Sequence, residues 1–162
     1  MKPTGHQPRI DRSSYDRTAP DVTAALYALG KAVDASGLDK SLTELIKVRA
    51  SQINGCAFCL QYHLNLARQL GVSVAKLDLV AVWREAGVYS PRERAALAWT
   101  EALTLMAANE VSDSVYAELQ GQFSEPEIVF LTAAVGAINV WNRIAGALHF
   151  APPPAAAAAG AA

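Results

Sequence analysis

The sequence predicts an all-α fold in which six to seven helices form a bundle within a single domain. Apolar residues recur at helical spacing along most of the chain, and no segment alternates between apolar and polar residues as a half-buried strand would. The β-branched residues are scattered and not clustered. The chain has 162 residues, of which 52% are hydrophobic and 18% charged, so it can form one domain with a hydrophobic core.

Composition divides the chain into three parts. Residues 1–19 are polar and contain two prolines, which predicts an extended or loosely attached N-terminal arm. Residues 20–150 carry the helical periodicity and form the predicted domain. Residues 151–162, APPPAAAAAGAA, are of low complexity and lack large apolar side chains, so we expect a disordered or loosely ordered tail.

The first three helices of the domain each end at a turn that contains glycine. The first begins at Pro20, because the fixed φ of proline suits the first helical turn, and it ends at Gly37. The second spans about residues 40–53 and repeats leucine and isoleucine on a helical period. The third covers about residues 56–70 and stops at the glycine that follows.

Four further helices complete the predicted bundle. A shorter helix is expected over residues 73–87, and a Ser-Pro-x-Glu start signal precedes the next one, over 91–107. Another covers 112–123, and a similar start signal opens a last helix over 126–150 that is apolar on nearly every side. A helix of this kind lies at the centre of its domain or in a subunit interface, and we expect both, hence a homo-oligomer.

The charge balance gives no basis for binding nucleic acid or a membrane. The chain has Lys+Arg 14 and Asp+Glu 15, which leaves neither a basic face nor a polybasic segment. The N-terminal residues carry charges without an apolar stretch, and no later run reaches the roughly 18 uncharged apolar residues of a membrane span. We therefore expect a soluble, cytoplasmic protein without nucleic acid or membrane partners.

The candidate site lies in the stretch TELIKVRASQINGCAFCLQYHLNLAR, which holds both cysteines and one of the three histidines. On a helix, Cys56, Cys59 and His63 occupy positions i, i+3 and i+7 and therefore share one face. Glu44 lies on the preceding predicted helix, and a turn at the Asn-Gly pair would fold the two helices back to back. The pattern predicts that a base and a carboxylate lie beside a pair of thiols.

Redox catalysis is the first interpretation of this group. In a reducing cytosol, a CxxC pair is more often catalytic or metal-binding than structural. Thiols in the first turn of a helix meet unpaired N–H groups and the positive end of the helix dipole, which lower their pKa. His63 could take the proton of Cys59, directly or through a water, while Glu44 orients the base or accepts the proton next. A Cys59 thiolate would attack a peroxide and become a sulfenic acid, which would condense with Cys56 to a disulfide that an external reductant reopens.

We weigh four other interpretations of the same residues and reject one of them, covalent haem. A metal-binding module would use both thiolates, the imidazole and Glu44, although thiolates on a single helix make a poor tetrahedral cage. Covalent haem requires a histidine directly after the second cysteine, where Leu60 stands, and is rejected. A redox-sensing or scaffold protein would use the same disulfide without sustained catalysis. The structural alternative is a pair of ordinary buried cysteines with a hydrogen-bonded core histidine.

The sequence neighbours of four further side chains indicate their roles. Phe58 and Tyr62 flank the row of thiols and base, where they line a pocket or belong to the core. Asn142 and Arg143 interrupt the apolar last helix and need polar partners if they are buried. For Arg143, the candidate partners are glutamates on the helix that starts at residue 91.

The pattern of Glu44, Cys56-Ala-Phe-Cys59 and His63 resembles the signature of the alkylhydroperoxidase D-like (AhpD-like) proteins in the carboxymuconolactone decarboxylase superfamily. The segment VWREAGVYSPRERAALAWTEALT and the later NVWNRIAGALHF are similar to segments of the single-domain members, so the resemblance covers most of residues 20–150. It implies an all-helical domain that assembles into trimers or hexamers and has thiol peroxidase activity.

The resemblance also implies a role for each site residue. Cys59 corresponds to the peroxidatic thiol, Cys56 to the resolving thiol, and His63 with Glu44 to the proton relay. No cofactor or metal is implied, and the expected partners are a hydroperoxide substrate and a dithiol or protein reductant. Phe58 stands where the best-characterised enzymes of the family have a second histidine. Decarboxylation of a lactone belongs to members without the cysteine pair.

Overall fold

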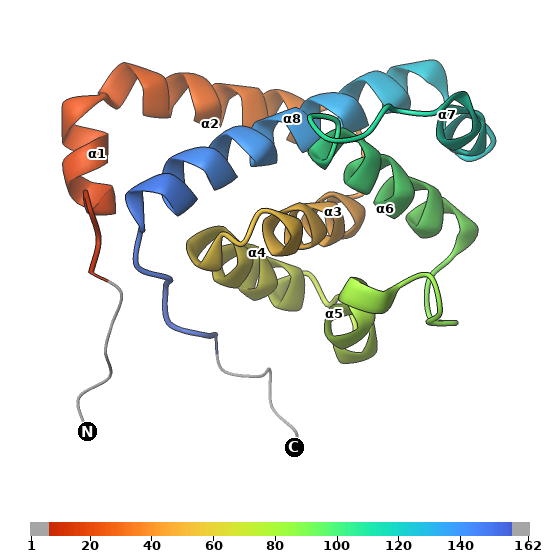
Figure 1. The fold of residues 1–162 in the computed structure, drawn as a ribbon, viewed down its shortest axis with the longest axis horizontal. Helices are drawn as coiled ribbons and strands as arrows, with labels where there is room; N and C mark the ends of the chain where they lie inside the picture. Colours follow the sequence, from red (N-terminus) through yellow and green to blue (C-terminus); the bar gives the residue numbers. More distant parts are fainter. Residues whose placement is uncertain (1–6, 157–162) are drawn as a thin grey trace.

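The structure, a computed structural model, describes residues 7–156, and the predicted all-α class is confirmed. Within these residues the chain forms eight α-helices, one 3-10 helix and no strand (Figure 1). In chain order, the helices are α1 (Arg12–Thr18), α2 (Pro20–Asp34), α3 (Lys40–Ile53), α4 (Ala57–Gln69), α5 (Val74–Leu79), η1 (Val80–Val82), α6 (Pro91–Thr104), α7 (Asp113–Gln120) and α8 (Glu125–Leu148).

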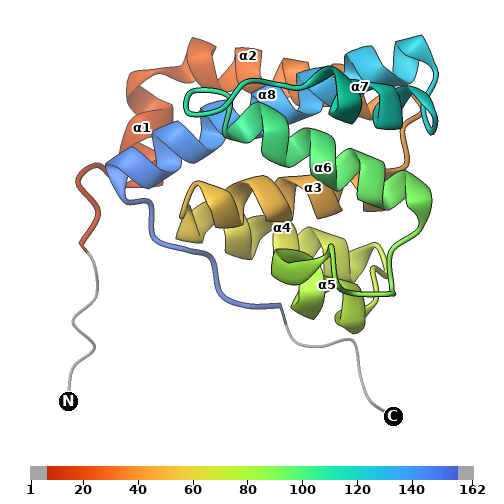
Figure 2. The same cartoon turned by 45° about the vertical axis from the view of Figure 1, so that its right-hand side comes forward.

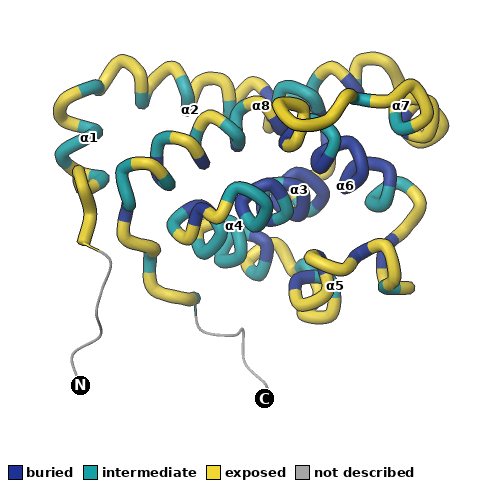
Figure 3. Tube along the Cα trace, in the orientation of Figure 1, coloured by how far each residue is buried: buried dark blue, intermediate teal, exposed yellow. Residues whose placement is uncertain are grey.

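Helix α3 lies at the centre of the molecule. It packs against α4, α6 and α8, while α2 runs along α8 on the outside of the bundle (Figures 1 and 2). Eight of its residues are buried, and the tube in Figure 3 is dark blue along much of α3 and α6. Because α3 carries Glu44, the carboxylate of the candidate site belongs to the helix whose position is held from several sides.

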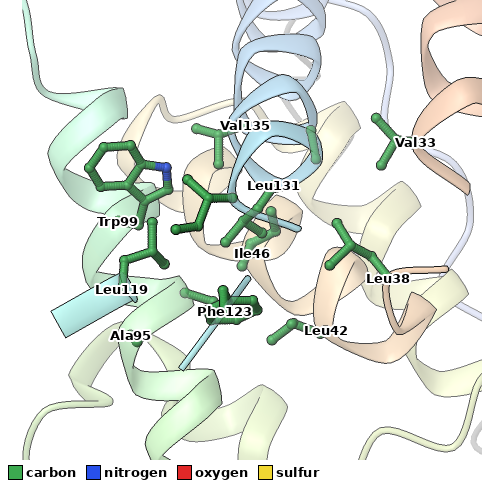
Figure 4. Packing of buried hydrophobic residues seen from close by; sticks show 13 residues of the cluster. Val33, Leu38, Leu42, Ile46, Ala95, Trp99, Leu119, Phe123, Leu131 and Val135 are labelled. Atoms are coloured by element: carbon green, nitrogen blue, oxygen red, sulfur yellow. The ribbon is translucent and has the colours of Figure 1, made fainter. Parts of the chain in front are cut away.

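The hydrophobic core holds α3 through two of its faces. On one face, Ile46 is fully buried with Leu131 of α8 and Leu119 of α7 (Figure 4). On the other face, Leu45 and Val48 pack with buried residues of α4, α5 and α6. Fully burying a side chain of this size contributes about 2 kcal/mol. The core therefore positions α3 between the bundle formed with α6, α7 and α8 and the layer formed by α4 and α5.

Both predicted start signals are capping boxes in the structure. Ser90 caps α6 by accepting from the Glu93 amide, and Glu93 Oε2 accepts from the Ser90 amide at 2.8 Å. At the start of α8, the Ser124 amide donates to Glu127 Oε2 at 2.8 Å, and the Ser124 hydroxyl donates to the same oxygen at 2.9 Å. These boxes pair N–H groups that the first helical turn leaves without partners.

The prediction of one helix over residues 73–87 was wrong in its second half. The α-helix ends at Leu79, and after η1 the chain forms turns. Arg94 donates to the main-chain carbonyls of Trp83 and Arg84 at 3.0 Å each, so these carbonyls bond a side chain instead of a helical N–H. The turn places the Trp83 ring in the core.

The expected extended N-terminal arm was also wrong for residues 12–18, which form α1. Asp11 caps this helix by accepting from the Ser14 amide at 2.9 Å, a start signal that was visible in the sequence. Tyr15 packs edge-on against Phe150 with 5.7 Å between ring centroids, and the Arg9 amide donates to the Leu148 carbonyl. The arm is therefore attached to the C-terminal end of α8; its first six residues lie outside the described part.

The first half of the C-terminal tail, for which we expected a disordered or loosely ordered segment, is hydrogen-bonded to α4. The Asn65 side chain donates to the Pro154 carbonyl and accepts from the Ala156 amide, each at 2.9 Å. An asparagine amide offers both a donor and an acceptor, so it can bond an extended segment that has no helix of its own. Residues 157–162 lie outside the described residues.

Helix α8 is long and apolar enough, by length and hydropathy, to cross a membrane, and within residues 7–156 it is the one helix that meets this test. It also packs against α2, α3, α4, α6 and α7, with seven of its residues buried. A central core helix meets the same test of length and hydropathy.

Candidate active site

The turn between α3 and α4 brings the predicted carboxylate and base together. Gly55 adopts a φ of 65°, which favours glycine, and reverses the chain between the two helices. The reversal places Glu44 Oε2 2.6 Å from His63 Nδ1. The sequence pattern had indicated this contact from helical spacing and the Asn-Gly turn alone.

Glu44 is an ionised carboxylate in a nearly closed environment. Its residue is 5% exposed, and Lys47 Nζ lies 2.7 Å from the second carboxylate oxygen. Burial by itself would raise the pKa of Glu44, but the hydrogen bond and charge of His63, with those of Lys47, outweigh burial and lower the pKa. A carboxylate only accepts hydrogen bonds, so His63 donates through Nδ1–H, and Nε2 is left for a second partner.

Cys56 is the N-cap residue of α4, and its sulfur is the acceptor at the helix start. The Cys59 amide donates to Cys56 Sγ at 3.3 Å. The hydrogen bond from the Cys59 thiol is the largest effect and lowers the pKa of Cys56; burial opposes it, but further hydrogen bonds help to bring the pKa to about 7. Cys56 is therefore the thiol of the pair that ionises more readily near neutral pH.

Cys59 shows the opposite behaviour. Its hydrogen bond to Cys56 and its burial raise the pKa of Cys59 above the ordinary value for a thiol. The prediction that the helix N-terminus acidifies both thiols is therefore wrong for Cys59. The physical reason is that the Cys59 thiol hydrogen-bonds Cys56 and is buried, and these two effects outweigh the lowering effect of the backbone N–H at the helix start.

Asn142 of α8 is a site residue whose role the sequence did not indicate. It is 3% exposed and donates to Ser51 Oγ at 3.0 Å, while its Oδ1 accepts from Asn54 Nδ2 at 2.9 Å. Its side chain also lowers the pKa of both thiols. The one signal in the sequence was an asparagine within an apolar helix, which predicted a polar partner without naming it.

The partner expected for Arg143 was wrong. Arg143 is exposed and donates to the main-chain and side-chain oxygens of Asn139, one helical turn earlier. Glu101 instead accepts from Arg49 at 2.7 Å, from the indole of Trp83 at 2.8 Å and from Arg84. Helix α8 turns Arg143 to its solvent side, so it needs no buried carboxylate.

A pocket of about 360 Å³ opens beside Cys59 and His63. Walls from α2, α3, α4 and α8 enclose it, and Arg12 of α1 adds to the lining. Glu44, Cys59 and His63 line this pocket, whereas Cys56 is not part of the lining and is 1% exposed. The aromatic part of the lining is formed by Tyr27, Phe58, Tyr62 and Trp141. A volume of this size is in the range of small-ligand sites.

The arrangement differs from a metal site. Within the described ranges, no three His, Cys, Asp or Glu side chains gather as metal ligands would. The proposed fourth ligand, Glu44, is committed to His63 and Lys47, and Cys56 bonds the start of α4. The donor set therefore suits proton transfer and thiol chemistry better than a tetrahedral cage.

Residues 20–102 match the model of the Carboxymuconolactone decarboxylase family. This chain belongs to that family. The uncharacterised protein YdfG of Bacillus subtilis strain 168 is 36% identical over 137 residues, which cover 85% of this chain and 93% of YdfG. The family resemblance of the cysteine signature is thereby confirmed.

Solved structures of this family's AhpD-related proteins share the fold. One, from Agrobacterium tumefaciens, is described as a protein of unknown function and provisionally as the antioxidant defence protein AhpD. It is 42% identical with a TM-score of 0.86, over 91% of this chain and 99% of that chain. Another, from Ralstonia eutropha JMP134, is described as an alkylhydroperoxidase AhpD core and an uncharacterised peroxidase-related protein. It is 25% identical with a TM-score of 0.76, over 93% of this chain and 79% of that chain.

Proposed function

We propose that this member of the family is a cytosolic thiol peroxidase that reduces hydroperoxides with the Cys56–Cys59 pair. The observation that carries the proposal is one site with three parts: two free cysteines at the start of α4, a pocket that reaches Cys59, and a histidine bound to a buried carboxylate. The description of related structures as peroxidase-related proteins supports the same reaction class.

Cys59 is the attacking thiol in this proposal, because it lines the pocket and Cys56 does not. Its raised pKa means that its proton must be removed when the substrate is present. His63 lies one turn later on α4 and accepts this proton at Nε2, while the Glu44 carboxylate stabilises the imidazolium. The sulfur attacks the terminal peroxide oxygen and the O–O bond breaks. The imidazolium returns its proton to the leaving oxygen, so the products are an alcohol and a Cys59 sulfenic acid.

Cys56 completes the cycle as the resolving thiol. With a pKa of about 7, it is substantially ionised at neutral pH before the sulfenic acid forms. It attacks the Cys59 sulfur, the S–S bond forms, and hydroxide leaves and is protonated to water. One hydroperoxide and two thiols thus give one alcohol, one water and one disulfide. An external dithiol or protein reductant supplies two electrons and two protons to reopen the pair.

The first experiment follows the thiols by mass spectrometry before and after one equivalent of cumene hydroperoxide. The wild type should lose both thiols as a Cys56–Cys59 disulfide. Cys56→Ser should stop after one turnover with a Cys59 sulfenic acid that dimedone traps, and Cys59→Ser should keep Cys56 free. Unchanged turnover in Cys59→Ser would contradict the proposal.

A redox sensor that uses the same disulfide is the second candidate. The observation in its favour is burial, because Cys56 and Cys59 are 1% and 3% exposed and a protein reductant has little access to either sulfur. The two functions differ in sustained turnover. Many cycles with a small dithiol as reductant would indicate a peroxidase, whereas one oxidation followed by a change in assembly would indicate a sensor.

The proposed assembly is a homo-oligomer, a trimer or a hexamer. Helix α8 leaves Val129 and Val140 60% and 41% exposed, with Gly136 between them on the same side. Apolar surface on a central helix is suited to contact with a second copy of the chain. Light scattering of the purified protein tests this proposal, and a monomer at micromolar concentration would contradict it.

A further inference from the structure

We infer that the pocket beside Cys59 selects hydroperoxides that combine an aromatic or branched apolar body with a carboxylate or a similar anionic group. This inference rests on the proposed peroxidase function and adds the substrate class. It follows from the chemical division of the pocket, which has an aromatic region on α4, α8 and part of α2 and a cationic region on α2 and α3.

The aromatic region accounts for the apolar body. Tyr27 and Trp141 lie 5.8 Å apart between ring centroids, and Phe58 stacks with Tyr62 at 6.2 Å. The Arg12 guanidinium lies 5.0 Å from the centre of the Trp141 ring and belongs to the same lining. Flat aromatic walls bury a ring or a branched alkyl group by dispersion and the hydrophobic effect.

The cationic region accounts for the anionic group. Four cationic side chains line the pocket, against the two carboxylates Asp34 and Glu44. Counted without His63, the lysines, the arginine and the carboxylates of the lining leave an excess of two positive charges, although the whole chain has a net charge of -1. A concave site with an excess of one sign attracts ligands of the opposite sign.

Lys31 is the cation that remains available for a ligand. Lys40 pairs with Asp34 at 3.0 Å, Lys47 pairs with Glu44 at 2.7 Å, and Arg12 pairs with an aspartate of its own helix. Over residues 7–156, Lys31 forms no ion pair with a carboxylate. It follows Tyr27 by one helical turn on α2, so the α2 wall carries an aromatic group and an unpaired ammonium side by side.

The test compares para-carboxycumene hydroperoxide with its methyl ester, which has the same body without the charge. In the wild type, kcat/KM should be higher for the acid than for the ester. Lys31→Gln should lower kcat/KM for the acid about threefold and should leave kcat/KM for the ester unchanged. Lys76→Gln is the matched control, because Lys76 lies outside the pocket and pairs with Glu93. Adding 0.5 M salt to the wild type should also lower the ratio of kcat/KM for the acid to kcat/KM for the ester, because salt screens the charge of Lys31.

Two outcomes separate the substrate class from the peroxidase function. Equal kcat/KM for acid and ester in the wild type would overturn the inference and leave the peroxidase standing. If neither compound is reduced, the peroxidase proposal fails. The charge preference is then decided by quenching of tryptophan fluorescence with 4-isopropylbenzoate and its methyl ester, which contain no peroxide. If the benzoate binds more tightly than its ester, and Lys31→Gln weakens binding of the benzoate, the charge preference is supported. Equal binding of the two compounds overturns it.

Discussion

Glu44 Oε2 and His63 Nδ1 lie 2.6 Å apart, and this contact joins the central helix α3 to α4, whose first turn and N-cap hold the two cysteines. The two side chains are 6% and 12% exposed, so bulk water screens the contact only weakly. The buried carboxylate fixes the histidine tautomer and offers a negative charge next to any proton that the ring takes up.

Glu44→Gln should therefore lower kcat/KM for hydroperoxide reduction about 100-fold, because the amide keeps the shape but cannot stabilise the imidazolium. Peroxide consumption under steady-state conditions measures the effect. Glu93→Gln is the matched control, since it removes a carboxylate outside the pocket and glutamine still suits a capping box. Equal losses in both variants would show that the Glu44 effect is general destabilisation and not loss of the relay.

The charge on Cys56 should be visible as a thiolate absorbance at 240 nm. In the reduced wild type we expect a titration midpoint of about 7, because hydrogen bonds stabilise the thiolate. Cys59→Ala removes the thiol donor and should move the midpoint up towards the ordinary thiol value of 9.0. Asn142→Leu removes a weaker donor and should cause a smaller upward shift. A wild-type midpoint close to 9 would contradict this assignment.

Glu101 should contribute stability at neutral pH that is lost in acid. Burial alone would raise its pKa, but donors from Trp83, Arg84 and Arg49 lower it below 4.5. A carboxyl group with a lowered folded-state pKa stabilises the protein above its unfolded pKa, and this contribution disappears as the pH falls through the folded value. Glu101→Gln should cost about 2 kcal/mol at pH 7.

Urea unfolding of both proteins at pH 7 and again at pH 3 measures this difference. The difference in free energy of unfolding between the wild type and Glu101→Gln should be fully present at pH 7 and smaller at pH 3. Glu118→Gln, on α7, removes a carboxylate without an ion pair among the described residues; it is the control and should change little at either pH. A gap that stays constant with pH would show that packing, and not charge, explains the loss.

Arg12 should affect binding of aromatic substrates, although it lies in the N-terminal segment. Its guanidinium lies over the Trp141 ring at 5.0 Å and donates to the Tyr27 hydroxyl at 2.8 Å. Arg12→Ala should raise KM for cumene hydroperoxide about threefold with little change in kcat, because it removes a wall of the pocket and a cation–π contact. Arg17→Ala, on the same helix but outside the pocket lining, should leave KM unchanged. A similar rise in both variants would point to loss of α1 instead.

The sequence by itself determined the all-α class, the family and the meeting of Glu44 with His63. Those conclusions depend on local physics. Helical spacing puts Cys56, Cys59 and His63 on one face, and a glycine with positive φ is enough to fold α4 back on α3.

Only the tertiary structure decided which of the two thiols has the lower pKa and which residues surround the pair. The pKa values of Cys56 and Cys59 depend in part on Asn142, which reaches them because α8 packs across α3 and α4. The pocket needs α2 and α1. The start signal of α1 was present in the sequence, but its attachment beside the end of α8 rests on contacts such as Tyr15 with Phe150. Such long-range contacts arise from how apolar helix faces pack together, and residue spacing along one helix carries no information about them.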